Sequence, residues 1–318
     1  MAASIAFFGS DSSGAAGPRR SKILAITHIS ILPMDRNRSL SDQTVIVDDE
    51  RIIEIGSSLT VRIPPGSKVV DGRGMWLTPG LADLHTHVHD AATLAMMPRL
   101  GVTTILDMGG GGADFYKLRD LIREGGAAGP NILTALKIDG PGDEGSTAIV
   151  PSCEAEARAA VRRARDEQYD FVKVYSRLSP PIFHAIADEA RKQRIAVIGH
   201  AVRSVSLANS FQAGQIMLAH AEEFLAGFGD SAPDRSAIPA LVALTRKHGV
   251  TVTANLDGIQ RIAAQWGKPD VTAQYVLDGR KANVPTSQLQ GWLKASYSRL
   301  GGTYDAEAGF VTQLVTAL

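Results

Sequence analysis

The segment His85-Thr86-His87 places two histidines two positions apart, at the end of the stretch LADLHTH, residues 81–87. Residues two positions apart on an extended strand point to the same side of a sheet. Two imidazoles on one face can bind a divalent metal ion, because imidazole is the commonest nitrogen ligand of zinc-like metals. His85 and His87 are therefore candidate metal ligands; the alternative is a pair of hydrogen-bonded core histidines.

Two more histidines directly follow apolar runs later in the chain. His200 comes after IAVIG and His220 after IMLA, and an alanine follows each of them. If both runs are neighbouring strands of one parallel sheet, the two histidines lie at the same end of the sheet as the H-x-H motif. We therefore expect His200 and His220 to join His85 and His87 in one metal site.

Lys173 lies inside the apolar segment FVKVY, residues 171–175. An ammonium group buried without a partner is costly, so a strand lysine needs an explanation. One explanation is a salt bridge, for which Asp170 is close in sequence. The other is that carbon dioxide converts the amine to a carbamate, an oxygen ligand able to bridge two metal ions. The residues alone do not separate these two explanations.

Other polar residues near these positions could act on a substrate. Tyr175 shares the strand face of Lys173 and could donate a hydrogen bond to an oxyanion, or it packs under a loop. His89 belongs to the loop that follows the H-x-H motif, where it could contact substrate. Arg177 and Arg203 lie just beyond two predicted strands and could bind a substrate carboxylate through paired hydrogen bonds.

Two glutamates, a glycine run and a cysteine could also belong to a functional site, but each has a simpler structural interpretation. Glu222 and Glu223 directly follow His220 and either orient a metal ligand or are solvated loop charges. The glycine run 109–112 lacks the Lys-Ser/Thr of a phosphate-binding loop, so we expect a flexible loop at the rim of a barrel. Cys153 is the only cysteine and has no histidine near it in sequence, so we do not expect it to be a nucleophile.

Apolar strand-like segments alternate with helical patterns after residue 80. The predicted strands cover residues 81–87, 103–109, 131–138, 171–175, 196–201, 215–221 and 251–257. The predicted helices between them cover residues 91–100, 115–123, 154–167, 181–193, 205–213 and 238–247. This alternation predicts a parallel sheet, and the lack of a dinucleotide-binding glycine fingerprint favours a (β/α)₈ barrel over a doubly wound sheet.

The last third of the chain departs from a complete barrel. Helical patterns cover residues 259–266, 286–298 and 306–318, and no eighth strand is found. We therefore expect an α/β fold of the TIM-barrel type that lacks its eighth strand in this chain, over residues 78–318. Short β-branched segments separated by turns predict a small all-β sandwich module over residues 22–77, and residues 1–21 read as a flexible tail.

The segments LTPGLADLHTH and GVTTILDMGG, followed by a strand lysine and by His200 and His220, resemble the amidohydrolase superfamily. Within it they resemble the imidazolonepropionase-like and Xaa-Pro dipeptidase-like branch. The N-terminal strand module, with DGRGMWLTPG as its junction, resembles the superfamily as well. The resemblance covers residues 22–318 and is specific for the superfamily rather than for a substrate.

The resemblance implies a metal-dependent hydrolase with two divalent metal ions, zinc first and manganese, cobalt or iron as alternatives. His85 and His87 would bind one ion, His200 and His220 the other, and a carbamate on Lys173 would bridge them. A hydroxide bridging the metals would attack the carbonyl of an amide, a cyclic amide or a dipeptide and break a C–N bond. The superfamily also uses an Asp at the end of the eighth strand as general base, and no residue of this chain is assigned that role.

Two other hypotheses remain at this stage. The same metal site could hydrolyse a lactone, an ester or an organophosphate. Alternatively, the chain is a C-terminally truncated, non-catalytic fragment that keeps its metal ligands, because neither the eighth strand nor the superfamily's C-terminal strands of the β module are found.

Composition limits the classes of partner. Lys plus Arg number 33 and Asp plus Glu number 33, so the net charge is zero and neither nucleic acid nor a membrane surface is an expected partner. No apolar run reaches the roughly 18 residues that span a bilayer. We expect a cytoplasmic protein that acts on a small-molecule amide or dipeptide, and a homo-oligomer stays an open alternative to a monomer.

Overall fold

The computed structural model describes residues 23–142, 147–229, 231–277, 286–294 and 296–318. The predicted tail, residues 1–21, lies outside this range. The chain divides between Gly80 and Leu81 into two compact units, and each is described by itself. Within the described ranges no helix has the length and apolar composition needed to cross a membrane.

The N-terminal unit is one mixed β-sheet. Its strands are β1 (Ile23–Ile31), β2 (Leu40–Asp48), β3 (Arg51–Ser57), β4 (Lys68–Asp71) and β5 (Trp76–Leu77). The order is β3-β2-β1-β4, and β5 also pairs with β1. The strands therefore form a single described sheet rather than the two packed layers of the sandwich we expected, because both β4 and β5 pair with β1, which leaves no strand for a second layer.

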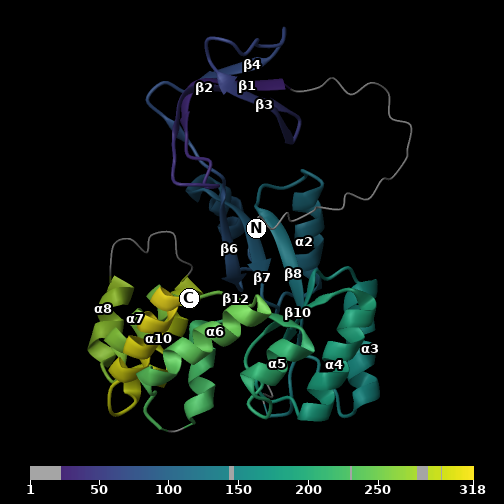
Figure 1. Ribbon diagram of the computed structural model, residues 1–318, viewed down its shortest axis with the longest axis vertical. Coiled ribbons are helices and arrows are strands. Elements are labelled where there is room, and N and C mark those ends of the chain that lie inside the picture. Colours follow the sequence, from purple (N-terminus) through teal and green to yellow (C-terminus); the bar gives the residue numbers. More distant parts are fainter. Residues whose placement is uncertain (1–22, 143–146, 230, 278–285, 295) are drawn as a thin grey trace. The chain divides into compact units, whose positions relative to one another are not determined.

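The second unit is a curled, parallel, seven-stranded sheet in the order β12-β11-β10-β9-β8-β7-β6 (Figure 1). Its strands are β6 (Leu81–Thr86), β7 (Val102–Asp107), β8 (Asn131–Ile138), β9 (Phe171–Val174), β10 (Ala196–Gly199), β11 (Gln215–Leu218) and β12 (Thr251–Val252). The described residues contain no eighth strand in this sheet. The prediction of a (β/α) barrel that lacks a strand is confirmed.

Helices follow most strands of the second unit (Figure 1). They are α1 (Ala91–Met96) with the 3₁₀ helix η1 (Met97–Leu100), α2 (Ala113–Arg123), α3 (Glu154–Asp166), α4 (Pro180–Gln193), α5 (Leu207–Ala213), η2 (Ala221–Phe228), η3 (Arg235–Ala237), α6 (Ile238–His248), α7 (Leu256–Gln265), α8 (Pro269–Leu277), α9 (Thr286–Leu293), η5 (Ser296–Arg299) and α10 (Asp305–Ala317). In α3, Ala157, Ala160, Val161 and Ala164 are buried. Their helical spacing makes one apolar face, which packs on the outer side of the sheet together with α4.

Successive side chains along each strand point to opposite sides of the sheet, and each side has its own hydrophobic cluster. Leu136 and Val172 belong to the outer cluster beneath α3 and α4, whereas Ala135 and Ile198 belong to a cluster on the opposite side of the sheet. Lys173 follows Val172 and therefore faces the inner side. The strands thus direct the chemistry-bearing side chains into the mouth of the barrel.

The predicted seventh strand, residues 251–257, is longer than the strand observed. β12 ends at Val252, and Asn255, at φ +48°, precedes the first residue of α7. Asn adopts the left-handed region more readily than most residues, so it can end an extended segment abruptly. Helix α8 was not among the helices expected from the sequence.

Candidate active site

Four histidines lie together at the carboxyl ends of the barrel strands. His85 is in β6 and His87 directly follows it, while His200 follows β10 and His220 lies two residues after β11. The ring centroids of His85 and His87 are 5.5 Å apart, those of His85 and His220 are 4.4 Å apart, and those of His200 and His220 are 5.0 Å apart. Strands far apart in sequence therefore bring the four imidazoles into one cluster.

Backbone carbonyl groups hold the first pair of rings. Nδ1 of His85 lies 2.7 Å from the carbonyl oxygen of Ala219, and Nδ1 of His87 lies 2.8 Å from that of Gly109. A carbonyl oxygen only accepts, so each Nδ1 must carry the proton. Burial lowers the pKa of His85 to about 3 and also lowers that of His87, so both rings are neutral at pH 7. Their Nε2 atoms therefore keep a lone pair for a ligand.

Carboxylates hold the second pair of rings. Nδ1 of His220 lies 3.0 Å from Oε1 of Glu222, and Nδ1 of His200 lies 2.5 Å from Oε1 of Glu223. A histidine that binds a metal usually donates its other ring N–H to a carbonyl or carboxylate in this way. The structure thus gives both glutamates an orienting contact and excludes the alternative of purely solvated charges.

The closest approach between imidazoles joins His85 and His220, whose Nε2 atoms are 3.3 Å apart. If Nδ1 carries the proton in both rings, two lone pairs face each other at this distance. Such an arrangement is favourable only when a cation, either a proton or a metal ion, lies beside the two nitrogens. The two Nε2 atoms are therefore close enough for one proton or one metal ion to contact both.

Lys173 is completely buried in β9, and no atom in the described ranges accepts a hydrogen bond from its Nζ. Burial, followed by repulsion from Lys137, lowers the pKa of Lys173 to about 7. The alternative of a salt bridge to Asp170 is wrong. Oδ2 of Asp170 instead accepts the backbone N–H of Thr134 at 2.7 Å, because β9 and β8 are neighbours and Asp170 lies at the base of β9.

Lys137 was not identified from the sequence. It lies directly beside Lys173 in the register of β8 and β9. The Nζ atoms of Lys137 and Lys173 lie 4.8 Å and 4.7 Å from the centre of the Tyr175 ring, within the range of a cation–π contact. A lysine inside the apolar segment NILTALKI, residues 131–138, is the signal that could have found it, since it is the same signal that singled out Lys173.

Tyr175, Arg177 and Arg203 line one hollow beside His200, with a volume of about 780 Å³. The ring of Tyr175 lies 4.2 Å from that of His200. Arg177 is held by the buried Asp139, whose Oδ2 is 2.6 Å from Nη2 of Arg177. The side chain of Arg203 is exposed. The structure thus gathers these three predicted site residues, with Glu222 and Glu223, around one opening.

His89 takes a different direction. Its Nε2 lies 2.9 Å from Oδ1 of Asp107, and its ring packs edge-on against Phe115 at 4.8 Å. His89 is not among the residues that line the hollow beside His200. Asp107 ends β7 and is completely buried, and burial raises its pKa. Sequence reasoning missed Asp107, although an acidic residue in the apolar segment TTILDMG was visible.

Comparisons with known proteins find partial likenesses to hydrolases. No family model matches the chain. The chain is 34% identical over 113 residues to a deacetylase of Brucella anthropi, covering 33% of this chain and 28% of that protein. It is 32% identical over 78 residues to an imidazolonepropionase of Alkaliphilus metalliredigens, covering 24% of this chain and 16% of that protein. The matched stretches therefore span less than a third of either relative.

Solved structures share the fold over most of the chain. Bottromycin amidohydrolase has a TM-score of 0.65 at 21% identity, covering 94% of this chain and 64% of that chain. A Xaa-Pro dipeptidase with methionine bound in its active site has a TM-score of 0.60 at 14% identity, covering 92% and 84%. These likenesses support the resemblance of the chain to the amidohydrolase superfamily. The four histidines occupy the strand ends that the resemblance assigned to metal ligands.

A glycine lets the ends of β9 and β10 approach each other closely. Gly199, at φ +126°, directly precedes His200, and a Cβ there would lie 2.2 Å from the carbonyl oxygen of Val174. That same carbonyl accepts the backbone N–H of His200 at 2.9 Å. Only glycine allows this close approach of β10 to β9, which fixes where the His200 side chain begins.

The donor set of the site can be tested against the metal ions that the superfamily implies. In the described part of the chain, no group of three or more His, Cys, Asp or Glu side chains is arranged to hold a metal ion. The histidines nevertheless supply Nε2 lone pairs, and the buried amine of Lys173 has no hydrogen-bond partner in those ranges. These donors fit two divalent ions only if Lys173 contributes oxygen ligands as a carbamate, which matches the explanation left open by the sequence.

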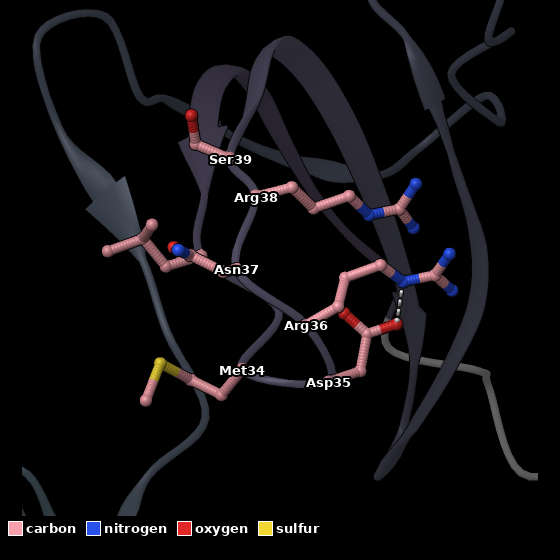
Figure 2. A pocket seen from close by; sticks show the side chains of 7 residues that line it. Met34, Asp35, Arg36, Asn37, Arg38 and Ser39 are labelled. Atoms are coloured by element: carbon pink, nitrogen blue, oxygen red, sulfur yellow. Dashed lines mark hydrogen bonds and ion pairs between the residues drawn. The ribbon is translucent and has the colours of Figure 1, made fainter.

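A second hollow, of about 600 Å³, lies in the N-terminal unit along residues 32–39. Figure 2 shows the guanidinium groups of Arg36 and Arg38 extending to the same side of this turn between β1 and β2. Nε of Arg36 pairs with Oδ2 of Asp35 at 3.0 Å. This hollow is formed by an exposed turn, and none of its lining residues was a candidate site residue from the sequence.

Proposed function

We propose that this protein is a metal-dependent hydrolase of C–N bonds in a small molecule, such as an amide, a cyclic amide or a dipeptide. The names of its relatives and structural neighbours, which include a deacetylase, an imidazolonepropionase and a Xaa-Pro dipeptidase, support a hydrolase. The observation that carries the proposal is the group of four histidines, each held at Nδ1 by an outer partner, on a sheet that also buries the amine of Lys173.

The proposal assigns the metal ligands as the resemblance implies. His85 and His87 would hold one divalent ion, His200 and His220 would hold the other, and a carbamate on Lys173 would supply oxygen ligands. Zinc is the first choice, and manganese, cobalt or iron also suit imidazole and carbamate donors. Such ions, when bound, acidify a water molecule and polarise a scissile carbonyl group.

The chain's own residues position the substrate in this proposal. The hollow beside His200 has the size of a pocket for a small molecule. The Tyr175 hydroxyl would donate a hydrogen bond to the oxygen that gains charge. The Tyr175 ring lies 4.2 Å from the His200 ring, which places this tyrosine beside the histidine cluster. Arg203, whose side chain is exposed, offers a cation for a substrate carboxylate, whereas Arg177 is already paired with Asp139.

The experiment measures metal content and turnover together. The purified chain is supplied with zinc or manganese in bicarbonate buffer and assayed on Xaa-Pro dipeptides, N-acyl amino acids, lactones and esters. We expect bound metal in the wild type, with turnover of a C–N substrate, and loss of both in His85→Ala. His184→Ala, which removes an exposed histidine of α4, is the matched control and should retain both.

Two results would contradict the proposal. One is a wild-type chain without bound metal after supplementation with either ion. The other is equal metal content in His85→Ala and His184→Ala, which would show that the histidine cluster is not the binding site. Turnover of lactones or esters alone would reassign the bond while leaving the metal site in place.

A further inference from the structure

Lys137 places a second amine on the inner side of the sheet. It lies beside Lys173 in the register of β8 and β9, so the two side chains share a face. The side chain of Lys137 is partly exposed, and its Nζ lies 4.8 Å from the centre of the Tyr175 ring. Gly109 packs against its base, since a Cβ there would lie 3.1 Å from the Cβ of Lys137. The side chain is therefore directed from β8 towards Tyr175.

The ammonium group of Lys137 has no counter-ion within the described ranges. There its Nζ contacts the Tyr175 ring but makes no hydrogen bond or ion pair. The acid two residues later, Asp139, is used elsewhere. Its Oδ2 lies 2.6 Å from Nη2 of Arg177, and its Oδ1 accepts the backbone N–H of Gly140 at 2.8 Å. A cation that is partly withdrawn from water is costly unless it is paired, so Lys137 is available to an anionic ligand.

This amine lies beside the space already assigned to substrate. Tyr175 and Asp139 both line the hollow beside His200. Strands β8 and β10 flank β9, so Lys137 and His200 approach Tyr175 from the two neighbouring strands. The His200 ring lies 4.2 Å from the Tyr175 ring. A molecule in the hollow can therefore place one of its groups beside Tyr175, within reach of the Lys137 side chain.

We propose that Lys137 is a substrate-binding residue whose ammonium group receives a carboxylate of the substrate beside the Tyr175 ring. Neither arginine near the hollow offers an equivalent group, because Arg177 is paired with Asp139 and the side chain of Arg203 is exposed, where water competes for its charge. The site would thus select substrates with an acidic group, such as N-acyl amino acids, over neutral amides. This choice of substrate class rests on the function proposed above, whereas the binding of a carboxylate at Lys137 does not.

Binding of a charged and a neutral ligand tests the proposal without turnover. The probes are N-acetyl-L-alanine and N-acetyl-L-alaninamide, which differ in charge but little in size. Metal is removed with a chelator that is then dialysed away, and carbonate-free buffer prevents a carbamate on Lys173 from competing. NMR titration measures the Kd of each probe. We expect the wild type to bind the carboxylate about 10- to 100-fold more tightly than the amide, the usual effect of a hydrogen bond to a charged group.

Variants at Lys137 decide which cation causes this preference. Lys137→Met removes the charge and keeps an unbranched side chain, so we expect it to bind the two probes equally. Lys137→Arg restores a cation and should recover part of the preference. Lys117→Met, at an exposed lysine of α2, is the matched control and should keep all of it. Lys137→Gln replaces Lys137→Met if the latter does not fold.

Two results would overturn the proposal. One is a wild type that binds both probes equally or binds neither, which needs no variant. The other is a preference for the carboxylate that is unchanged in Lys137→Met or Lys137→Gln, because another cation would then bind it.

Kinetics of the metal-loaded chain then connect this role to the proposed function. If the wild type hydrolyses N-acetyl-L-alanine, Lys137→Met should raise KM more than it lowers kcat, since the contact is made before the reaction begins. An unchanged KM in this variant would overturn the role of Lys137. A wild type that binds no metal would instead refute the proposed function, and the binding preference of the metal-free chain would still decide the role of Lys137.

Discussion

At the scale of single residues, hydrogen-bond partners decide the charge and tautomer of each group in the site. The carbonyl oxygens beside His85 and His87 can only accept, and burial keeps both rings neutral. Lys173 is the opposite case, because no acceptor within the described ranges compensates its charge. The folded metal-free chain therefore carries a penalty whenever Lys173 is protonated.

This penalty predicts a pH-dependent effect of Lys173→Met. The pKa of Lys173 falls from 10.5 to about 7, so the unfolded chain binds more protons than the folded chain between these values, and stability rises with pH through this window. Methionine has no such charge. In carbonate-free buffer with a chelator, we expect the variant to be more stable than wild type by up to about 4 kcal/mol at pH 7 and by about 1 kcal/mol at pH 10.

Urea unfolding at several pH values measures this difference. Lys117→Met, at an exposed lysine of α2, is the control and should show little change in the difference with pH. A Lys173→Met variant that is less stable than wild type at pH 7 would show that the amine has a compensating partner.

At the scale of elements, the ends of the strands are set by close backbone approaches. Gly199 lies where β10 approaches β9, directly before His200. A strand end with a longer side chain at this position would have to move away from its neighbour. The position of the His200 ring therefore depends on a residue that does no chemistry.

Gly199→Ala is expected to destabilise the chain by at least about 1–3 kcal/mol and to displace His200, because the new Cβ would meet a backbone oxygen and the φ angle is unfavourable for alanine. Gly258→Ala, within α7, has open space around its Cβ and should be neutral or slightly stabilising. Urea unfolding compares the two variants. Equal stability of both would contradict the close approach of β10 and β9.

The strands and helices show how far sequence patterns reach. The predicted strand 131–138 coincides with β8, because an apolar run bounded by turn residues has little freedom in its ends. The prediction for 251–257 continued too far, since Asn255 begins a helix although its neighbours are compatible with a strand. The local hydrophobic pattern therefore predicted where these strands lie, whereas the residue at which a strand ends depended on the backbone conformation of a single residue.

At the scale of the whole molecule, metal binding and folding of the barrel unit are linked in the proposed function. A ligand that binds only the folded chain at 100 times its Kd raises the free energy of unfolding by about 2.7 kcal/mol. We expect zinc to raise the unfolding midpoint of the wild type, and His220→Ala to abolish the shift. Calorimetry with and without a chelator measures it.

His184→Ala is again the control variant, here for the zinc-induced shift in the unfolding midpoint. His184→Ala should retain the full zinc shift, because the exposed His184 of α4 is not one of the four clustered histidines. A zinc shift that survives in His220→Ala would mean that zinc binds elsewhere in the folded chain. Both variants are compared at the same free zinc concentration, because the stabilisation depends on it.

The sequence by itself determined the class of fold and the residue types of the site. Hydrophobic period distinguishes strands from helices, and a histidine or lysine next to an apolar run must lie at or inside a strand. Only the tertiary structure decided the partners: Asp170 binds Thr134 instead of Lys173, His89 turns to Asp107, and Glu223 reaches His200. The reason is physical, since spacing along a strand sets the face of a residue, whereas contacts between distant residues depend on strand register and loop conformation.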